Sequence, residues 1–294
     1  MSIAAPLASL RDEAQAVARR AHVPFSGRPA AAALLLADGA WVPGVRVESA
    51  AFSLTIPPAL NAFSTAVAAE RGDVVALAMS RPAGPTERAF WASGPAGVAP
   101  LEPAAEDVLV AGDESLPALG NALDPLLPGA PPATAPDGVQ RARTVARRAL
   151  VPASRFQVGC VLALPGGALV PGANVEPLLE ADPTDWLRVL CAERCALGTA
   201  CSYGLFEESE SGSYEAGNAS AALPGDGPAL YLSCPHDPEG SPCGACRQLL
   251  VELLPDGVLW MDRAALGAPK RTSPSALLPG SFQGAALSKS VPSG

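Results

Sequence analysis

The sequence predicts an α/β fold that the chain contains twice. Helical patterns alternate with short buried strands bounded by Gly and Pro turns, which is typical of α/β domains. A ten-residue segment that begins at Val17 recurs from Val145, and Val42–Glu48 recurs in the same register as Val170–Glu176. This repeat is far longer than a solenoid repeat, so it indicates tandem duplication of one globular domain.

The two copies are expected to span residues 1–131 and 138–294, with a Pro- and Ala-rich linker between them. Each copy begins with a helix that a Val-Pro pair ends, because Pro disfavours helix at the preceding residue. A buried strand, a Gly turn and a second strand follow. We expect helices at 14–21, 139–150, 191–200 and from 243 to about 253, and strands at 30–37, 157–164, 229–233 and 258–261.

Composition narrows the class of protein. Hydrophobic residues make up 49% of the chain and charged residues 17%, which is enough apolar material for a packed core. The net charge of −9 disfavours nucleic-acid and anionic-membrane partners. No apolar run reaches the roughly 18 residues of a membrane span. The first residues show no basic cluster followed by an apolar stretch, so we do not expect a signal peptide. Six of the seven cysteines lie between Cys191 and Cys246, which indicates metal or catalytic chemistry in a reducing, cytoplasmic compartment.

Two short motifs in the second copy carry the chemistry. Cys243 and Cys246 form a C-x-x-C pair that follows Pro242, and Cys191 stands two residues before Glu193. A C-x-x-C pair alone fits redox, structural-zinc or catalytic-zinc roles. Three cysteine ligands plus a water give the open coordination of a catalytic zinc, and the combined pattern is the signature of zinc deaminases.

The second copy resembles the cytidine deaminases, and the whole chain resembles their two-domain form. The matching motifs cover nearly all of the second copy: Pro152–Gly159, Asn174–Glu176, Cys191–Arg194, Pro242–Gln248 and Leu277–Phe282. The resemblance implies a three-layer domain, a mixed sheet flanked by helices, duplicated in tandem.

The resemblance also implies site roles. Cys191, Cys243 and Cys246 would bind one Zn²⁺ per chain as thiolates. Glu193 would move a proton from the attacking water to the ring and to the leaving amine. The implied substrate contacts are Phe156 stacked on the base, Asn174 and Glu176 on the ribose hydroxyls, Ala192, and Phe282 closing a neighbouring site across a subunit interface.

Electrostatics supports a role for Arg194. Three thiolates and Zn²⁺ sum to a charge of −1, which would weaken the metal as a Lewis acid. Arg194 directly follows Glu193, and a guanidinium hydrogen bond to a thiolate sulfur would offset that charge. Helix N-termini at both motifs would also favour thiolates.

The first copy has lost this chemistry. It contains no cysteine, and Pro57 and Ala59 stand at the positions of the zinc cysteine and the glutamate. Arg46 replaces the Asn of Asn-x-Glu, and Arg28 replaces the stacking Phe. We expect an architectural role, in which Ala50–Ile56 lines the active site of the other copy.

The expected activity is hydrolytic deamination of cytidine and 2′-deoxycytidine in pyrimidine salvage, by a homodimer that acts on free nucleosides. The alternative is a deaminase of another small aminated nucleoside or base, such as a blasticidin-like antibiotic, because 14 residues, Pro177–Leu190, differ from the family pattern. A second insertion, Phe206–Gly227, is expected to be a surface loop. Three further hypotheses stay open: a closed four-thiolate zinc site that includes Cys195, a nucleic-acid editor, and a non-catalytic zinc-binding module.

Overall fold

The computed structural model of the 294-residue chain describes residues 4–95, 97–112, 115–176, 189–208, 214–215, 227–263, 267–282, 284 and 287. Most of the two predicted insertions therefore lies outside the described residues. Within the described part, no helix is long and apolar enough to cross a membrane.

The first domain places one sheet between helices. Its strand order is β2-β1-β3-β5-β4, and all of its paired strands are antiparallel. In chain order the elements are α1 (Ala5–Val17), η1 (Ala18–Arg20), β1 (Ala31–Leu36), β2 (Trp41–Val45), η2 (Phe52–Leu54), α2 (Pro58–Ala68), β3 (Val74–Met79), α3 (Pro85–Ala92), β4 (Leu101–Ala105) and β5 (Val108–Ala111).

The second domain repeats this plan with one change. Its order is β12-β11-β10-β6-β7, and β10 and β11 are parallel, so this sheet is mixed as expected. The change arises because α6 crosses over between two parallel strands, whereas α3 leads into the β4–β5 hairpin. The elements are α4 (Ala135–Ala146), β6 (Gly159–Ala163), β7 (Leu169–Ala173), α5 (Ala192–Ser202), β8 (Glu207–Glu208), β9 (Tyr214–Glu215), β10 (Ala229–Ser233), α6 (Gly244–Leu253), β11 (Val258–Met261), β12 (Lys270–Thr272) and α7 (Pro274–Leu277).

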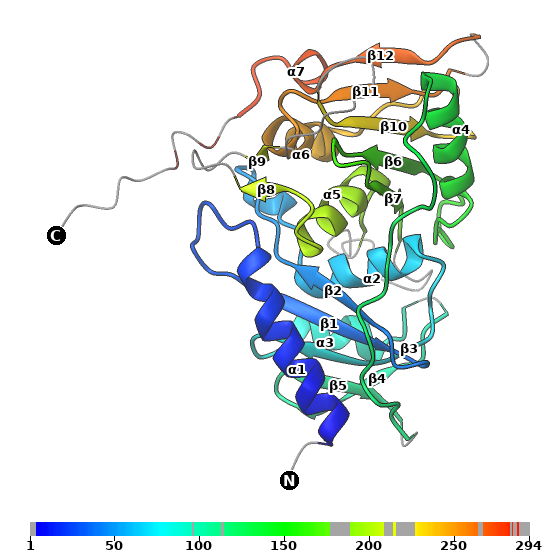
Figure 1. Ribbon diagram of the computed structural model, residues 1–294. Helices are drawn as coiled ribbons and strands as arrows, with labels where there is room; N and C mark the ends of the chain where they lie inside the picture. The colour runs from blue at the N-terminus through cyan, green and yellow to red at the C-terminus, as the bar shows by residue number, and fades with distance from the viewer. Residues whose placement is uncertain are drawn as a thin grey trace, which may run out of the picture.

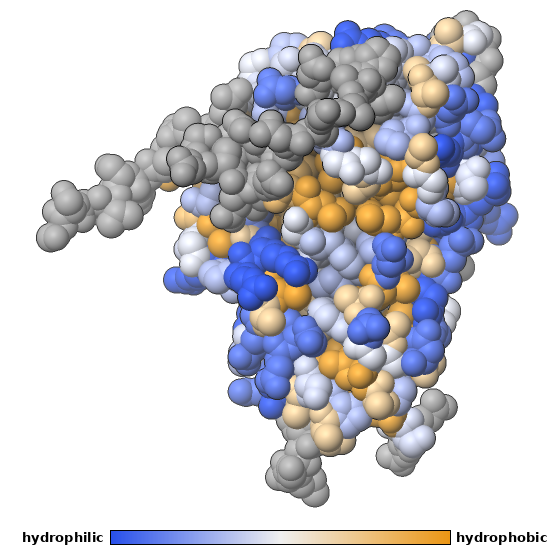
Figure 2. Space-filling model, viewed as in Figure 1, coloured by the Kyte–Doolittle hydropathy of each residue, from blue (hydrophilic) through white to orange (hydrophobic). Residues whose placement is uncertain are grey.

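The domains meet through their inner helices. Figure 1 shows α1 and α4 on the outer faces of the two sheets, with α2 and α5 between the sheets. All six residues of β1 are buried, as expected for a strand covered on both faces. Figure 2 shows apolar side chains gathered across the middle of the same view, over this inner layer.

The α2–α5 contact has approximate twofold symmetry in its hydrogen bonds. The Thr65 and Thr199 hydroxyls lie 2.7 Å apart, one from each helix. Arg20 donates to the Ser202 carbonyl at 2.9 Å at the end of α5, and its repeat counterpart Arg148 donates to the Ala68 carbonyl at 2.7 Å at the end of α2. One arginine of each repeated pair, Arg19-Arg20 and Arg147-Arg148, therefore ties the domains together.

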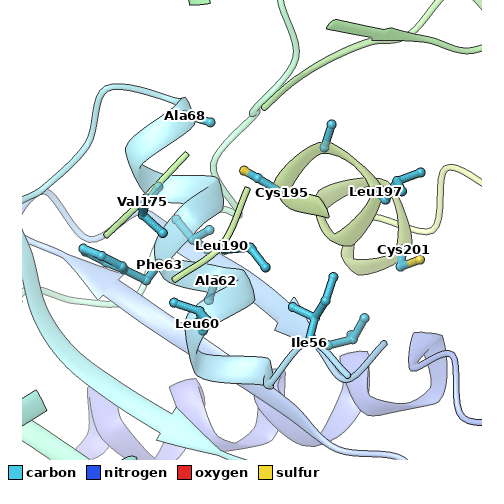
Figure 3. Close-up of a cluster of buried hydrophobic side chains, with 14 of the residues drawn as sticks. Ile56, Leu60, Ala62, Phe63, Ala68, Val175, Leu190, Cys195, Leu197 and Cys201 are labelled. Atoms are coloured by element: carbon cyan, nitrogen blue, oxygen red, sulfur yellow. The ribbon is translucent and has the colours of Figure 1, made fainter. Parts of the chain in front are cut away.

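Apolar packing surrounds these bonds. Figure 3 shows Ala62 and Phe63 of α2 near Leu190 and Cys195 of the second domain. Cys195 is fully buried and its thiol donates to the Ser64 carbonyl at 3.3 Å. The interface therefore forms part of one continuous core, in which neither inner helix has a solvent-exposed side.

The predicted opening helices end earlier than expected. The helix expected at 139–150 ends at Ala146, and the one expected at 14–21 runs from Ala5 to Val17. The cause is that Leu150 pairs with the strand end instead, since its amide donates to the Asn174 carbonyl at 3.0 Å. His22 makes the equivalent bond to the Arg46 carbonyl at 3.0 Å in the first domain. The strands at 229–233 and 258–261 and the helix starts after Cys191 and Cys243 are confirmed.

A glycine in each second strand lets the inner helix pack closely. A Cβ on Gly44 would lie 2.2 Å from the Pro58 carbonyl oxygen and 2.4 Å from the Ala62 nitrogen. The equivalent Cβ on Gly172 would lie 2.1 Å from the Ala192 carbonyl oxygen. Both clashes involve backbone atoms, so a side chain would push a whole helix outward.

We predict that Gly44→Ala lowers the free energy of unfolding by about 1–3 kcal/mol through overpacking. Urea unfolding followed by circular dichroism would measure it. Gly72→Ala is the matched control because a Cβ there meets nothing within 4 Å, and it should be neutral or slightly stabilising. Equal stability of the two variants would contradict the close-packing argument.

Candidate active site

Three cysteines converge where two helices begin. Cys191 is the N-cap of α5, Cys243 is the N-cap of α6, and Cys246 lies in the first turn of α6. The sulfur of Cys243 lies 3.7 Å from that of Cys191 and 3.5 Å from that of Cys246. All three sulfurs lie within 4.8 Å of one another, which is the spacing of ligands around a single metal ion.

The donor set fits zinc. Hydrogen bonds with the Cys191 and Cys246 thiols hold the pKa of Cys243 well below its usual range, so the cluster favours one thiolate even before a cation is considered. Two helix N-termini direct their positive dipole ends at the same point. Cys195 stays outside the cluster, because its thiol is bonded to Ser64 instead. The geometry therefore favours three cysteine ligands over the closed four-thiolate alternative.

Glu193 lies beside this cluster in the first turn of α5. Its side chain is only 3% exposed, and the Cys246 thiol lies 3.3 Å from its Oε2. Burial raises the pKa of Glu193 to about 7, which places it near the protonation midpoint at neutral pH. A buried carboxylate poised in this way is suited to general acid–base chemistry.

The predicted nucleoside-binding residues Phe156, Asn174 and Glu176 are linked by hydrogen bonds within one loop region. Phe156 is 38% exposed although it is a large aromatic residue, which leaves a ring face available. The Asn174 side chain accepts from the Val158 amide at 2.8 Å and donates to the Phe156 carbonyl at 2.9 Å. Glu176 accepts from the amide of Ser154 at 2.9 Å and from its hydroxyl. In this structure, then, Asn174 and Glu176 shape the loop that presents Phe156.

The first domain repeats the glutamate clamp without the chemistry. Glu48 accepts from the Ser26 amide at 3.1 Å and from its hydroxyl at 2.5 Å, as Glu176 does with Ser154. Pro57 caps α2 where Cys191 caps α5, and Ala59 stands where Glu193 stands. The structure thus places the missing zinc and glutamate positions where the sequence comparison expects them.

A segment of the first domain lies against α5 and α6, the helices that carry the three cysteines. Glu252 of α6 accepts from the Ser49 hydroxyl at 2.9 Å and from the Ala50 amide at 3.1 Å. Arg194 of α5 reaches the same segment, since its guanidinium donates to the Leu54 carbonyl at 2.7 Å, and its contact with a thiolate sulfur stays a prediction. Residues 49–54 are therefore held at the site from two helices.

The C-terminal segment joins the same region. Gln248 donates to the Phe282 carbonyl at 2.6 Å and to Glu252 at 2.5 Å. Phe282 itself is 51% exposed. A Cβ on Gly284 would lie 2.3 Å from the Phe25 ring of the first domain, so the chain beyond Phe282 reaches that domain. Ser154 and Gln248 lie within the matching motifs but received no role of their own, and Glu252 was not predicted. The spacing of one helical turn between Gln248 and Glu252 indicates that they share a face of α6.

Comparison with known families adds independent evidence. Residues 134–261 match a family described as the cytidine and deoxycytidylate deaminase zinc-binding region, and residues 2–79 match a second family of the same description. A cytidine deaminase from Halalkalibacterium halodurans is 33% identical over 135 residues, which is 46% of this chain and 83% of that protein. The chain belongs to the cytidine deaminase family.

Other members of the cytidine deaminase family match to a similar extent. A cytidine deaminase from Sporosarcina psychrophila is 29% identical over 146 residues, which is 49% of this chain and 88% of that protein. The solved cytidine deaminase of Burkholderia pseudomallei is 28% identical, covers 51% of this chain and 99% of that chain, and has a TM-score of 0.38. The Halalkalibacterium halodurans and Sporosarcina psychrophila proteins are each about half as long as this chain, in keeping with a tandem duplication.

We predict that Cys243→Ser reduces bound zinc to a small fraction of the native content, because one of three thiolate ligands becomes a poor donor. Inductively coupled plasma mass spectrometry on the purified chain would measure it. Cys201→Ala is the control, since Cys201 is buried in α5 away from the cluster and its loss should leave zinc unchanged. Full zinc retention by Cys243→Ser would contradict the assigned ligand set.

Proposed function

We propose that this chain is a zinc-dependent hydrolase that converts cytidine and 2′-deoxycytidine to uridine and 2′-deoxyuridine. The reaction consumes one water and releases one ammonia. The observation that carries the proposal is the buried Glu193 beside three cysteines at facing helix N-termini. The chain belongs to the same family as known cytidine deaminases. Hydrolysis of an aromatic amine requires a group that acts as general acid and base next to a bound metal.

Cys191, Cys243 and Cys246 would hold the metal. Zinc bound by three protein ligands supplies Lewis acidity that makes a water nucleophilic near neutral pH. Glu193 supplies the proton transfers: its Oε2 would carry one proton of the attacking water to the ring nitrogen and, after the attack, the second proton of that water to the leaving amine. A pKa of about 7 suits both directions, since neither protonation state is strongly disfavoured at pH 7.

The nucleoside would be oriented by the predicted substrate-binding residues. The exposed Phe156 ring would stack on the base, and Ala192 and Phe282 would line the bound substrate. Asn174 and Glu176 would bind the ribose hydroxyls; because both now bond to the Ser154–Val158 loop, substrate binding would exchange or share those hydrogen bonds. This coupling would link sugar recognition to the placement of Phe156.

A second substrate class is a blasticidin-like aminated nucleoside or base. The feature that favours it is Pro177–Leu190, which departs from the family pattern directly before Cys191 in the sequence. A panel of cytidine, 2′-deoxycytidine, cytosine and blasticidin S, assayed for ammonia release, separates the two. The preferred substrate should exceed the others by at least about tenfold in kcat/KM.

The assembly and setting are also part of the proposal. One Zn²⁺ per chain follows from Pro57 and Ala59 at the first domain's corresponding positions. A homodimer of two-domain chains would bring four related domains together. The exposed Phe52 and Phe282 side chains support this proposal, because a partner chain would cover them. A cytoplasmic role in pyrimidine salvage fits free nucleoside substrates and seven unpaired cysteines.

We predict that Glu193→Ala lowers kcat for cytidine by at least about 10²–10⁴-fold while zinc content stays at the native level. Loss of absorbance on deamination measures turnover, and metal analysis is run on the same sample. Glu102→Ala, an exposed carboxylate in β4 of the first domain, is the control and should keep native turnover. Substantial activity in Glu193→Ala would overturn the mechanism.

We also predict that Phe52→Ala raises KM for cytidine several-fold, because the 49–54 segment is held against α5 and α6 by Arg194 and Glu252. Phe52 is 66% exposed, so its truncation should not unfold the domain. Ser53→Ala, at the neighbouring exposed position, is the matched control. Unchanged KM and kcat in Phe52→Ala would show that the segment does not line the site.

A further inference from the structure

Glu252, near the end of α6, is the meeting point of three segments that are far apart in the chain. Its carboxylate accepts from the Ser49 hydroxyl at 2.9 Å and from the Ala50 amide at 3.1 and 3.2 Å, both in the first domain. It also accepts at 2.5 Å from Gln248, one turn earlier in α6, and Gln248 donates to the Phe282 carbonyl at 2.6 Å. One side chain therefore links the first domain, the helix that carries the C-x-x-C pair and the C-terminal segment.

These hydrogen bonds lie where little solvent reaches. Ser49 is fully buried, and Ala50 and Gln248 are 3% and 7% exposed. Without the carboxylate, the Ser49 hydroxyl and the Ala50 amide would each lose this acceptor with little water to replace it, which is costly. Bonds to an ionised acceptor are also stronger than bonds between neutral groups. Glu252 can therefore fix the positions of the segments that it links.

The branch in the first domain ends at an exposed aromatic ring. The Ser49 hydroxyl also accepts from the Ala51 amide at 3.2 Å, which orders the turn that leads into η2. Phe52 begins η2 and is 66% exposed, and at the end of η2 the Leu54 carbonyl accepts from Arg194. The Phe52 ring is therefore presented between two anchors, one on α6 and one on α5.

The C-terminal branch ends at a second exposed ring and returns to the first domain. Phe282 is 51% exposed, while its carbonyl is held from α6. Two residues later, a Cβ on Gly284 would lie 2.3 Å from the Phe25 ring and 3.5 Å from the Ala50 Cβ. Phe25 packs edge-on against Phe52, with 6.3 Å between the ring centroids. The segments that present Phe52 and Phe282 are therefore neighbours.

The corresponding helix of the first domain carries no acid at this place. Ser93 follows the N-cap Gly84 of α3 by nine residues, as Glu252 follows the N-cap Cys243 of α6. The Ser93 hydroxyl donates to the Phe90 carbonyl of its own helix at 2.7 Å. Of the two helices, the one with the acid is the one that begins with the cysteine pair, so the linkage accompanies the cysteine cluster.

We propose that Glu252 is a positioning residue for nucleoside binding, which fixes the Phe52 loop and the Phe282 segment relative to each other so that both rings reach one substrate. It acts through these two segments and not on the reacting atoms. The proposal rests on the proposed function, since it requires a nucleoside bound beside the cysteine cluster. Rings that hold the substrate equally before and during the reaction affect KM and leave kcat unchanged.

The test measures KM and kcat for cytidine, and Kd for uridine by calorimetry, on the zinc-loaded full chain. Glu252→Ala should raise KM and Kd at least about tenfold and keep kcat within about threefold, because bonds to a charged acceptor are lost. Glu252→Gln keeps one acceptor oxygen and should recover most of the lost affinity. Asp256→Ala removes an exposed carboxylate just after α6 and is the matched control, which should behave like the native chain.

Chymotrypsin gives a readout that does not depend on turnover, because it cleaves after aromatic residues in segments that open. Cleavage after both Phe52 and Phe282 should be several-fold faster in Glu252→Ala than in the native chain. Ser49→Ala removes one donor of the first-domain branch, so it should speed cleavage after Phe52 alone and raise KM by about threefold. If Glu252→Ala does not fold, by zinc content and circular dichroism, Ser49→Ala and Glu252→Gln decide the same question.

The outcomes separate this proposal from the function on which it rests. Native turnover together with an unchanged KM in Glu252→Ala, or a KM raised equally in Glu252→Gln and Glu252→Ala, would overturn the positioning role. Unchanged cleavage after Phe52 and Phe282 in Glu252→Ala would overturn it as well. A native chain that neither binds uridine nor deaminates cytidine would instead refute the proposed function, and this proposal with it.

Discussion

The packing of α2 against α5 is the constraint on which the rest of the structure depends. Each helix covers its own sheet with one side and the other domain with the opposite side, and the Thr65–Thr199 hydroxyl contact lies where the two cross. Because α5 also carries Cys191 and Glu193 at its start, the helix that holds the two domains together is the helix that positions the metal cluster. Any displacement of α2 is transmitted to the chemistry through a buried, close-packed interface.

This arrangement explains why a copy without metal ligands persists. The first domain supplies half of the inner helix layer, a carbonyl that anchors Arg194, and a loop that Glu252 holds beside α6. Removing it would expose an apolar face along α5 and leave buried polar groups without partners, each of which is costly. The Pro57 and Ala59 positions were free to lose their chemistry, since neither is needed for those contacts.

Motifs with strict chemical requirements were predictable from sequence, whereas cross-domain contacts were not. The Cys191, Glu193 and Cys243–Cys246 spacings fix a helix start and a ligand geometry, and the structure places them together. The helix ends near Leu150 and Ala21 were predicted too far along, because the pairing of Leu150 with Asn174 is a tertiary bond that no local pattern contains. The same limit applies to the hydrogen bond from Arg194 to the Leu54 carbonyl, which lies 140 residues away in the chain. The elements of the first copy after Ile56 were not predicted, since the repeat no longer resembles its partner there.

Glu48 and Glu176 make the same bonds to equivalent loops, although only the second domain carries the three-cysteine cluster. This glutamate therefore holds a turn in both domains, whether or not its domain contains the cluster. Selection for a correctly formed turn is enough to keep a glutamate at this position. A search that infers nucleoside recognition from this glutamate alone would therefore count a site in the first domain, where Arg46 replaces the Asn and no cysteine is present.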